Sequence, residues 1–568
     1  MATSSLFSSS YLRNEQFPGY NHLTGIKIIN PQFDARHRIV YDVNSECINT
    51  SKIMSSEKWP LRWHRTLKTK ALTLPVSPLK HIERCRTSNE DLSTSITYMS
   101  DLEQQLEELF STVKKMIREG NRDAALKLVE ANYGALKEQL DAGQKGVEQA
   151  AILDVLALSY THICDFKSAS CLLEELKEIL RTIENHEPYV DSILTHMGSM
   201  YTTLEMFEEA SIAYERGISI QETMIGKHSP LLVTSLLGIA KAYYSLGKAA
   251  KAIETYCRVI SILEGSKGVE SVDLVNPLLA LGNIFIKEGK AVDAEVSFKR
   301  ILSIYTKSYG EDDGRVGMAM CSLAHAACAK GNVDEAIKLY QEGLRSIKDS
   351  GYMSLDDTVF EKMRLDLAEL LHVAGRDQEG RELIEECLVI TEKYKGPNHP
   401  SSATHFVNLA ISYSRSKNFG EAERLLRKSL EILSDNTNPD DPSTAVPMLH
   451  LAVTLYKLKR DEEAENLALE VVRIREKAFG RQSAPVGEAL DCLVSIQTRL
   501  GKDEELLPLL WRVLEIQEEE MGPESEEVVT TLKKLVFFLN KLGRKTDIIP
   551  LKQRLSKLRT KYRDCIPT

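Results

Sequence analysis

The chain has 568 residues, 43% of them hydrophobic and 27% charged, and a net charge of -10. These values are typical of a folded protein in water, and no apolar run approaches the roughly 20 residues of a membrane-spanning helix. Residues 1–86 carry 13 Lys/Arg and 6 Asp/Glu, a net +7, so residues 87–568 carry -17. An acidic body disfavours nucleic-acid binding, which needs Lys and Arg against phosphates. We therefore expect no transmembrane segment and no nucleic-acid partner.

Residues 1–85 have the composition of a targeting segment. The first 30 residues are rich in Ser and Thr and contain a single acid, Glu15, beside the basic residues Arg13 and Lys27. This profile is typical of a transit peptide, and the segment has no continuous apolar core such as a secretory signal carries. We expect residues 1–85 to be a transit peptide that directs the chain to the chloroplast stroma. The alternative is a disordered leader on a cytoplasmic protein.

From residue 99 to residue 563 a marker residue, in most units alanine, recurs at a nearly fixed spacing. The steps between successive markers are 41 to 44 residues, most often 42. A period in this range is the signature of a stacked array of repeats. The marker positions are Ala125, Ala169, Ala210, Ala252, Ala294, Ala336, Gly380, Ala422, Ala464, Leu506 and Ile548.

Each repeat also has a fixed internal pattern of small and large residues. Around Ala294, the small residue Gly282 lies 12 positions before the marker, Phe285 lies 9 before it and Phe298 lies 4 after it. Two antiparallel helices approach closely only where the side chains at their crossing are small, and large side chains a turn away fill the remaining space. Glycines such as Gly289 mark the turn between the helices. The pattern predicts an all-α chain of about eleven helical hairpins over residues 99–563.

This spacing of small, aromatic, alanine and aromatic residues resembles the tetratricopeptide repeat, whose standard length is 34 residues. The 42-residue period and the connectors Gly226-Lys-His-Ser-Pro230 and Gly396-Pro-Asn-His-Pro400 resemble the kinesin-light-chain type of this family. The resemblance covers roughly residues 100–560 and implies a right-handed superhelical α-solenoid. Kinesin light chains carry a long heptad segment before the repeats, whereas here a leader-like sequence takes that place.

The sequence contains no catalytic or metal-binding motif. It has no His-Glu-x-x-His, no Gly-x-Ser-x-Gly and no phosphate-binding Walker loop. Cys321 and Cys328 lie seven positions apart, but no His or Cys at metal-ligand spacing accompanies them, so we interpret them as packed thiols. We expect a protein that is not an enzyme and that uses no cofactor or metal.

A binding surface is predicted from the resemblance. In the family the first helix of each hairpin lines a concave groove, and five positions, 15, 14, 11, 8 and 7 residues before the marker, face into it. Carried over, these positions include His196, Lys241, Asn283, Lys287, His325, Asp366, Glu369, Asn408, Arg415 and His450. The candidates for a peptide groove are His196, Lys241, Asn283, Lys287, His325 and Asn408.

The stretch from Lys241 to His325 is neutral to cationic in an otherwise acidic chain, which favours an extended or acidic peptide as the ligand. The alternative is that these residues form an ordinary solvated helix face. We therefore predict a non-enzymatic protein-interaction scaffold or assembly factor of the chloroplast, with other proteins as partners. The alternative function is a cytosolic kinesin-light-chain-like adaptor that links cargo to a motor or to the cytoskeleton.

Overall fold

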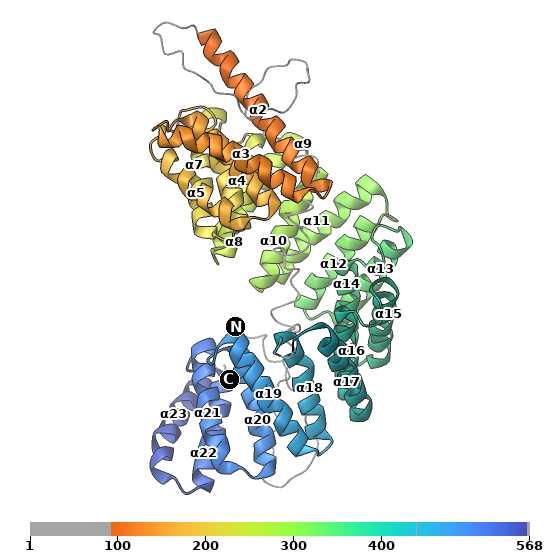
Figure 1. Ribbon diagram of the computed structural model, residues 1–568. Coiled ribbons are helices and arrows are strands. Elements are labelled where there is room, and N and C mark those ends of the chain that lie inside the picture. Colours follow the sequence, from red (N-terminus) through yellow and green to blue (C-terminus); the bar gives the residue numbers. More distant parts are fainter. Residues whose placement is uncertain (1–91, 439, 565–568) are drawn as a thin grey trace. The chain divides into compact units, whose positions relative to one another are not determined.

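The computed structural model describes residues 92–438 and 440–564 (Figure 1). These residues form 22 α-helices and two short 3-10 helices, and no β-strand occurs among them. Within the same ranges, no helix is both long and apolar enough to cross a bilayer. The predicted leader, residues 1–85, lies outside the described residues. The prediction of an all-α fold is confirmed.

The chain divides into two compact units, one ending at Gly331 and the other beginning at Asn332. Along the chain the helices alternate between A helices (even numbers), each the first of a pair, and B helices (odd numbers), each the second. The N-terminal unit contains α2 (Leu92–Arg118), α3 (Arg122–Asp141), α4 (Val147–Ile163), α5 (Phe166–Leu180), α6 (Val190–Thr203), α7 (Phe207–Ile225), η1 (Pro230–Leu232), α8 (Val233–Ser245), α9 (Ala249–Lys267), η2 (Val272–Leu274), α10 (Val275–Lys287), α11 (Ala291–Tyr309) and α12 (Gly314–Ala329).

The C-terminal unit contains α13 (Val333–Asp349), α14 (Thr358–Val373), α15 (Asp377–Lys395), α16 (Pro400–Arg415), α17 (Phe419–Asn436), α18 (Pro442–Lys457), α19 (Asp461–Phe479), α20 (Ala484–Leu500), α21 (Asp503–Met521), α22 (Glu526–Lys541) and α23 (Lys545–Asp564). The described helices thus make eleven consecutive pairs, the predicted number. Within each unit most neighbouring helices pack side by side, and A helices also contact the next A helix, as α4 contacts α6 and α16 contacts α18. Such serial packing is the arrangement of a repeat array.

The marker residues lie at the helix crossings and are buried. Ten of the eleven have side chains that are at most 4% exposed: Ala125, Ala169, Ala210, Ala252, Ala294, Ala336, Ala422, Ala464, Leu506 and Ile548. The eleventh marker, Gly380, is buried as well. The register that the sequence predicted is therefore the register of the structure.

Aromatic rings occupy the space above the small residues. A Cβ added to Gly282 of α10 would lie 2.4 Å from the ring of Phe298, four residues after the marker on α11. The ring of Tyr214 on α7 contacts two A helices, because an added Cβ would lie 2.7 Å from it at Gly198 of α6 and 2.3 Å from it at Gly238 of α8. One aromatic side chain therefore closes its own pair and joins that pair to the next.

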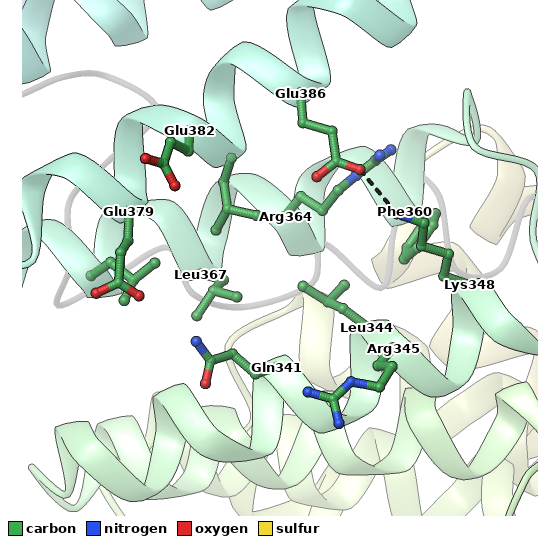
Figure 2. A pocket seen from close by; sticks show the side chains of 12 residues that line it. Gln341, Leu344, Arg345, Lys348, Phe360, Arg364, Leu367, Glu379, Glu382 and Glu386 are labelled. Atoms are coloured by element: carbon green, nitrogen blue, oxygen red, sulfur yellow. Dashed lines mark hydrogen bonds and ion pairs between the residues drawn. The ribbon is translucent and has the colours of Figure 1, made fainter.

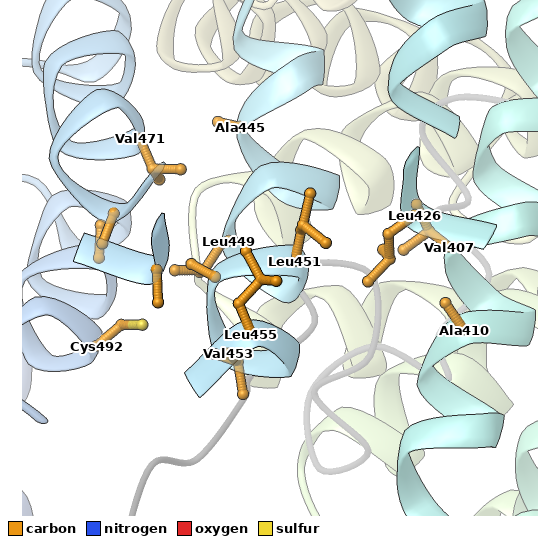
Figure 3. Close-up of a cluster of buried hydrophobic side chains, with 14 of the residues drawn as sticks. Val407, Ala410, Leu426, Ala445, Leu449, Leu451, Val453, Leu455, Val471 and Cys492 are labelled. Carbon is orange, nitrogen blue, oxygen red and sulfur yellow. The ribbon is translucent and has the colours of Figure 1, made fainter. Parts of the chain in front are cut away.

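Aliphatic side chains fill the remaining core. In the C-terminal unit a continuous cluster of buried residues runs from Ala368 on α14 to Ile516 on α21. Figure 3 shows its middle, where Leu451 of α18 lies between Leu426 of α17 and Val471 of α19. A second cluster covers α20 to α23. The core is thus distributed along the array and has no single centre.

The turns follow from local backbone chemistry. Gly247 and Gly289, each five residues before its marker, have φ of 71° and 72° and end their A helices in the left-handed conformation that glycine tolerates. Pro400 and Pro442 are the first residues of α16 and α18. Proline has no backbone N–H, but an N–H at the first position of a helix has no hydrogen-bond partner within the helix, so no bond is lost. The turn glycines were predicted from the sequence.

A repeated arginine fastens successive B helices. Arg258, six residues after its marker, donates from Nη2 to the carbonyl oxygen of Lys227 at 2.7 Å, and its Nη1 lies 2.7 Å from the Glu222 carboxylate. Glu222 lies in the last turn of the preceding B helix, α7, and Lys227 lies in the connector that follows Gly226. We call this arrangement the connector clamp, and the charged groups make its hydrogen bonds strong. It recurs at Arg300, Arg512 and Arg554.

The packing of Gly282 generates a stability prediction. Gly282→Ala should lower the free energy of unfolding by about 1–3 kcal/mol, because the new methyl group would overlap the Phe298 ring. The measurement is urea unfolding of the full chain followed by circular dichroism. The matched control is Gly265→Ala on α9, where an added Cβ meets no atom within 4 Å, so that stability should stay the same or rise by up to about 1 kcal/mol. Equal losses in the two variants would contradict the assigned crossing.

Candidate functional site

The structure divides the six predicted groove residues between the two units. Five lie on A helices of the N-terminal unit: His196 on α6, Lys241 on α8, Asn283 and Lys287 on α10, and His325 on α12. The sixth, Asn408, lies on α16 of the C-terminal unit. Every one of them is on an A helix, as the prediction required.

The six residues differ in exposure. His196, Asn283, His325 and Asn408 are buried, each at most 8% exposed. Lys241 is half-buried and Lys287 is exposed. His196 is also committed to a structural contact, because its Nδ1 lies 2.6 Å from Oδ2 of the fully buried Asp154 on α4. Lys241 of α8 and Lys287 of α10 are therefore the two candidates whose side chains reach solvent.

Five polar residues of α8 and α10 occupy predicted groove positions, and we call them the α8–α10 patch: Lys241, Tyr244, Ser245, Asn283 and Lys287. Lys287 connects the two helices, since its Nζ lies 5.0 Å from the centroid of the Tyr244 ring. Burial lowers the pKa of the Lys241 ammonium. All five residues occupy positions 11, 8 or 7 before their markers, which are groove positions in the resembled family.

Three polar atoms of this patch lack partners. Tyr244 Oη, Ser245 Oγ and Asn283 Nδ2 are buried and have no hydrogen-bond partner among the residues that the structure describes. A buried polar group without a partner costs free energy, so each would gain from an acceptor on a ligand. Amide, hydroxyl and ammonium groups together suit backbone carbonyls and carboxylates.

Sequence reasoning missed Tyr244 and Ser245. Both occupy groove positions, but a tyrosine in an aromatic pair such as Tyr243-Tyr244 is first interpreted as core. In the structure Tyr243 takes the core position and is 9% exposed, while Tyr244 carries the unpartnered hydroxyl. The spacing from the marker alanine was the signal that could have separated them.

The candidates in the C-terminal unit make contacts within the fold. Arg415 Nη2 of α16 lies 2.7 Å from the Glu369 carboxylate of α14, so these two predicted groove residues pair with each other. His450 of α18 is 6% exposed, and burial, with the Arg475 charge adding to it, lowers its pKa to about 4. An uncharged, buried imidazole contributes packing to the C-terminal unit.

Neither a metal cluster nor a disulfide occurs among the described residues. No three His, Cys, Asp or Glu side chains of residues 92–438 and 440–564 come together as metal ligands. Cys321 and Cys328 lie on α12, the first buried and the second half-buried, and all the cysteines in the described ranges are free thiols.

Comparison with known proteins identifies the repeats. The family model of the tetratricopeptide repeat matches residues 189–265, 273–349, 360–435 and 417–477. The chain therefore contains tetratricopeptide repeats, which typically serve as protein-interaction scaffolds. No curated protein matches the chain significantly.

Several solved structures are similar to the chain. A putative kinesin light chain of Podosopora anserina with nearly identical TPR-like repeats is 21% identical, with a TM-score of 0.33 over 36% of this chain and 95% of that one. BtubC (BKLC) of P. vanneervenii is 19% identical, with a TM-score of 0.32 over 44% and 93%. The apo form of RapI is 12% identical, with a TM-score of 0.43 over 70% and 99%. The assignment of the repeats rests on the family model and on the described helices.

The buried His450 generates a prediction for the pH dependence of stability. Its folded pKa of about 4 lies below the ordinary value of 6.5, so the unfolded chain binds the proton first as the pH falls. The stabilising contribution is therefore complete above pH 6.5 and is lost between pH 6.5 and 4. From pH 7 to pH 5 the loss should be about 2 kcal/mol.

The measurement for His450 is the unfolding free energy of the full chain at a series of pH values. The His450→Gln variant removes the titrating group and should show a shallower fall over the same range. Identical pH profiles for the two proteins would contradict a neutral buried imidazole.

Proposed function

We propose that the chain is a non-enzymatic protein-interaction scaffold or assembly factor, and that the α8–α10 patch of its N-terminal unit is the surface that binds an extended segment of a partner protein. The repeats support this proposal because serial helix pairs expose long rows of A-helix side chains. The observation that carries it is the cluster of unpartnered buried groups, Asn283 Nδ2, Tyr244 Oη and Ser245 Oγ, beside Lys241 and Lys287.

The charge of the patch indicates the chemistry of the partner segment. Lys241 and Lys287 are cations on a body whose residues 87–568 carry -17. Carboxylates of an acidic peptide would meet these two ammonium groups, and its backbone carbonyls would accept from the asparagine amide and the hydroxyls. This combination favours acidic or extended peptide segments, which bind by main-chain contacts as much as by side chains.

We further propose that the protein acts in the chloroplast stroma. The support for this location is the composition of residues 1–85, which is rich in Ser and Thr and poor in acids at its start. The corresponding alternative is the cytosolic adaptor of kinesin-light-chain type, which would link cargo to a motor or to the cytoskeleton.

Replacement of three patch residues tests the binding surface. Lys241→Ala, Asn283→Ala and Lys287→Ala together should reduce recovery of co-purified partner proteins by about tenfold or more, since each lost hydrogen bond to a charged group is worth about 1.5–3 kcal/mol. The measurement is quantitative mass spectrometry of proteins retained by the tagged full chain. The matched control removes two exposed lysines and one exposed asparagine elsewhere in the same unit, Lys248, Lys290 and Asn276. If both triple variants retain the same proteins as the wild type, the patch is not the binding surface.

The location is tested by fusing a fluorescent protein to the C-terminus of the full chain. The proposal predicts fluorescence inside chloroplasts and its loss when residues 1–85 are deleted. Fluorescence in the cytosol or along filaments would reject the chloroplast and favour the adaptor.

A further inference from the structure

The C-terminal unit contains a pocket between α13, α14 and α15 with a volume of about 530 Å³ (Figure 2). Phe360, Leu367 and Leu371 of α14 form an apolar floor, and each is at most 2% exposed. The two B helices form the walls: α13 supplies Arg345 and Lys348, and α15 supplies glutamates. A volume in this range is that of a ligand-binding site.

The connector clamp is absent beside the pocket, as it is in other repeats whose equivalent residue is not arginine, such as those with Glu342 and Glu470. Six residues after the marker Gly380, the position of the clamp arginine is taken by Glu386, which instead pairs with Lys348 of α13 at 3.3 Å. Both side chains of this pair are about half exposed, so the pair is weak. The carbonyl of Leu355, 31 residues before Glu386 as in the clamps, is bound by Arg364 of α14 at 2.6 Å. At this level α13 and α15 are therefore joined by the Lys348–Glu386 pair and not by a clamp.

Arg364 brings to the pocket a guanidinium group that makes only part of its possible hydrogen bonds. Its side chain runs along the pocket toward the end formed by Glu386 and Lys348 (Figure 2). It is 3% exposed, and its Nε and Nη1 have no hydrogen-bond partner among the described residues. Glu361, one turn earlier on α14, is occupied by His405 at 3.2 Å and by Lys395 at 3.9 Å. A buried cation with unmade hydrogen bonds is costly, so an anionic group entering the pocket would gain from it.

The walls leave a surplus of available positive charge. On α15, Glu379 is bound by Arg376 at 2.7 Å, and the Glu382 carboxylate accepts from Gln378 at 3.0 Å. Arg345 on the opposite wall is exposed and has no ion-pair partner among the described residues. Glu382 keeps its charge, because Gln378 is neutral, so once the ion pairs are counted the cations Arg345 and Arg364 outnumber one unpaired carboxylate; the Arg364 guanidinium also lies 4.5 Å from the centroid of the Phe360 ring. The pocket therefore combines an apolar floor with two guanidinium groups.

We propose that this pocket binds a short segment of a partner protein in which an apolar side chain stands next to Asp or Glu. The apolar side chain packs on the partly exposed Leu383, and the carboxylate meets Arg345 and Arg364. A peptide fits better than a simple anionic lipid because its backbone N–H groups can also donate hydrogen bonds to the Glu382 carboxylate on the facing wall. The inference rests on the proposed scaffold function and names a second surface and the chemistry of its partner.

The test uses the full chain and a phage-displayed library of random 12-residue peptides. Enriched peptides should share an acidic residue beside an apolar one, and fluorescein-labelled copies should bind in a fluorescence polarisation assay. Arg345→Glu should weaken their binding by about tenfold or more, and a peptide whose acid is replaced by Lys should bind this variant better than the wild type. Lys338→Glu, an exposed lysine of α13 outside the pocket lining, is the matched control and should change affinity by less than about twofold.

A second variant examines the buried cation. Arg364→Gln should also weaken binding while helicity and thermal unfolding are retained; if this variant does not fold, Arg345→Glu decides the question by itself. Peptides without an acid, or peptides whose binding Arg345→Glu leaves unchanged, would overturn the assignment, and so would the absence of any enriched peptide. Peptides lost only in the Lys241, Asn283 and Lys287 triple variant would place binding on the α8–α10 patch, refuting the pocket and supporting the proposed function.

Discussion

The close approach of two helix backbones at a small residue, with an aromatic ring filling the space beside it, is the contact on which the rest of the structure depends. Phe298 against Gly282 sets how closely α10 and α11 can pack. Tyr214 adds a second function, because its ring lies against Gly198 of its own pair and Gly238 of the next. A helix pair cannot bury its apolar face alone, so this shared ring makes stacking part of the same interaction.

Much of this architecture could be predicted from the sequence, since the marker residues, the turn glycines and the helix-starting prolines are local signals. The limits are also physical. The position five before the marker has a positive φ even where glycine is absent, as at Glu205 (60°), Lys417 (60°) and Lys459 (63°), because packing of the two helices fixes the turn. The connector clamp joins Arg258 to atoms 31 and 36 residues earlier, and no short motif announces such a bond.

The candidate sites, too, were predicted from the sequence only in part. The spacing from the markers correctly placed Lys241, Asn283 and Lys287 on A helices, but it could not tell that Asn283 would be buried with an unpartnered amide. The pocket beside Arg364 had no sequence signal, because its lining comes from three helices, α13, α14 and α15, and no short motif marks it. The two proposed surfaces differ in chemistry: the α8–α10 patch offers amide, hydroxyl and ammonium groups, and the pocket offers guanidinium groups beside apolar side chains.

The central claim, that a small residue and a ring set the approach of paired helices such as α10 and α11, is tested most directly by a double-mutant cycle on Gly282 and Phe298. The measured quantity is the unfolding free energy of the wild type, Gly282→Ala, Phe298→Leu and the double variant. If the ring limits the approach of the helices, the smaller leucine leaves room for the new methyl group, and the double variant should lose at least about 1 kcal/mol less than the sum of the single losses. Losses that add within about 0.5 kcal/mol would show that the two side chains act independently and would contradict the account.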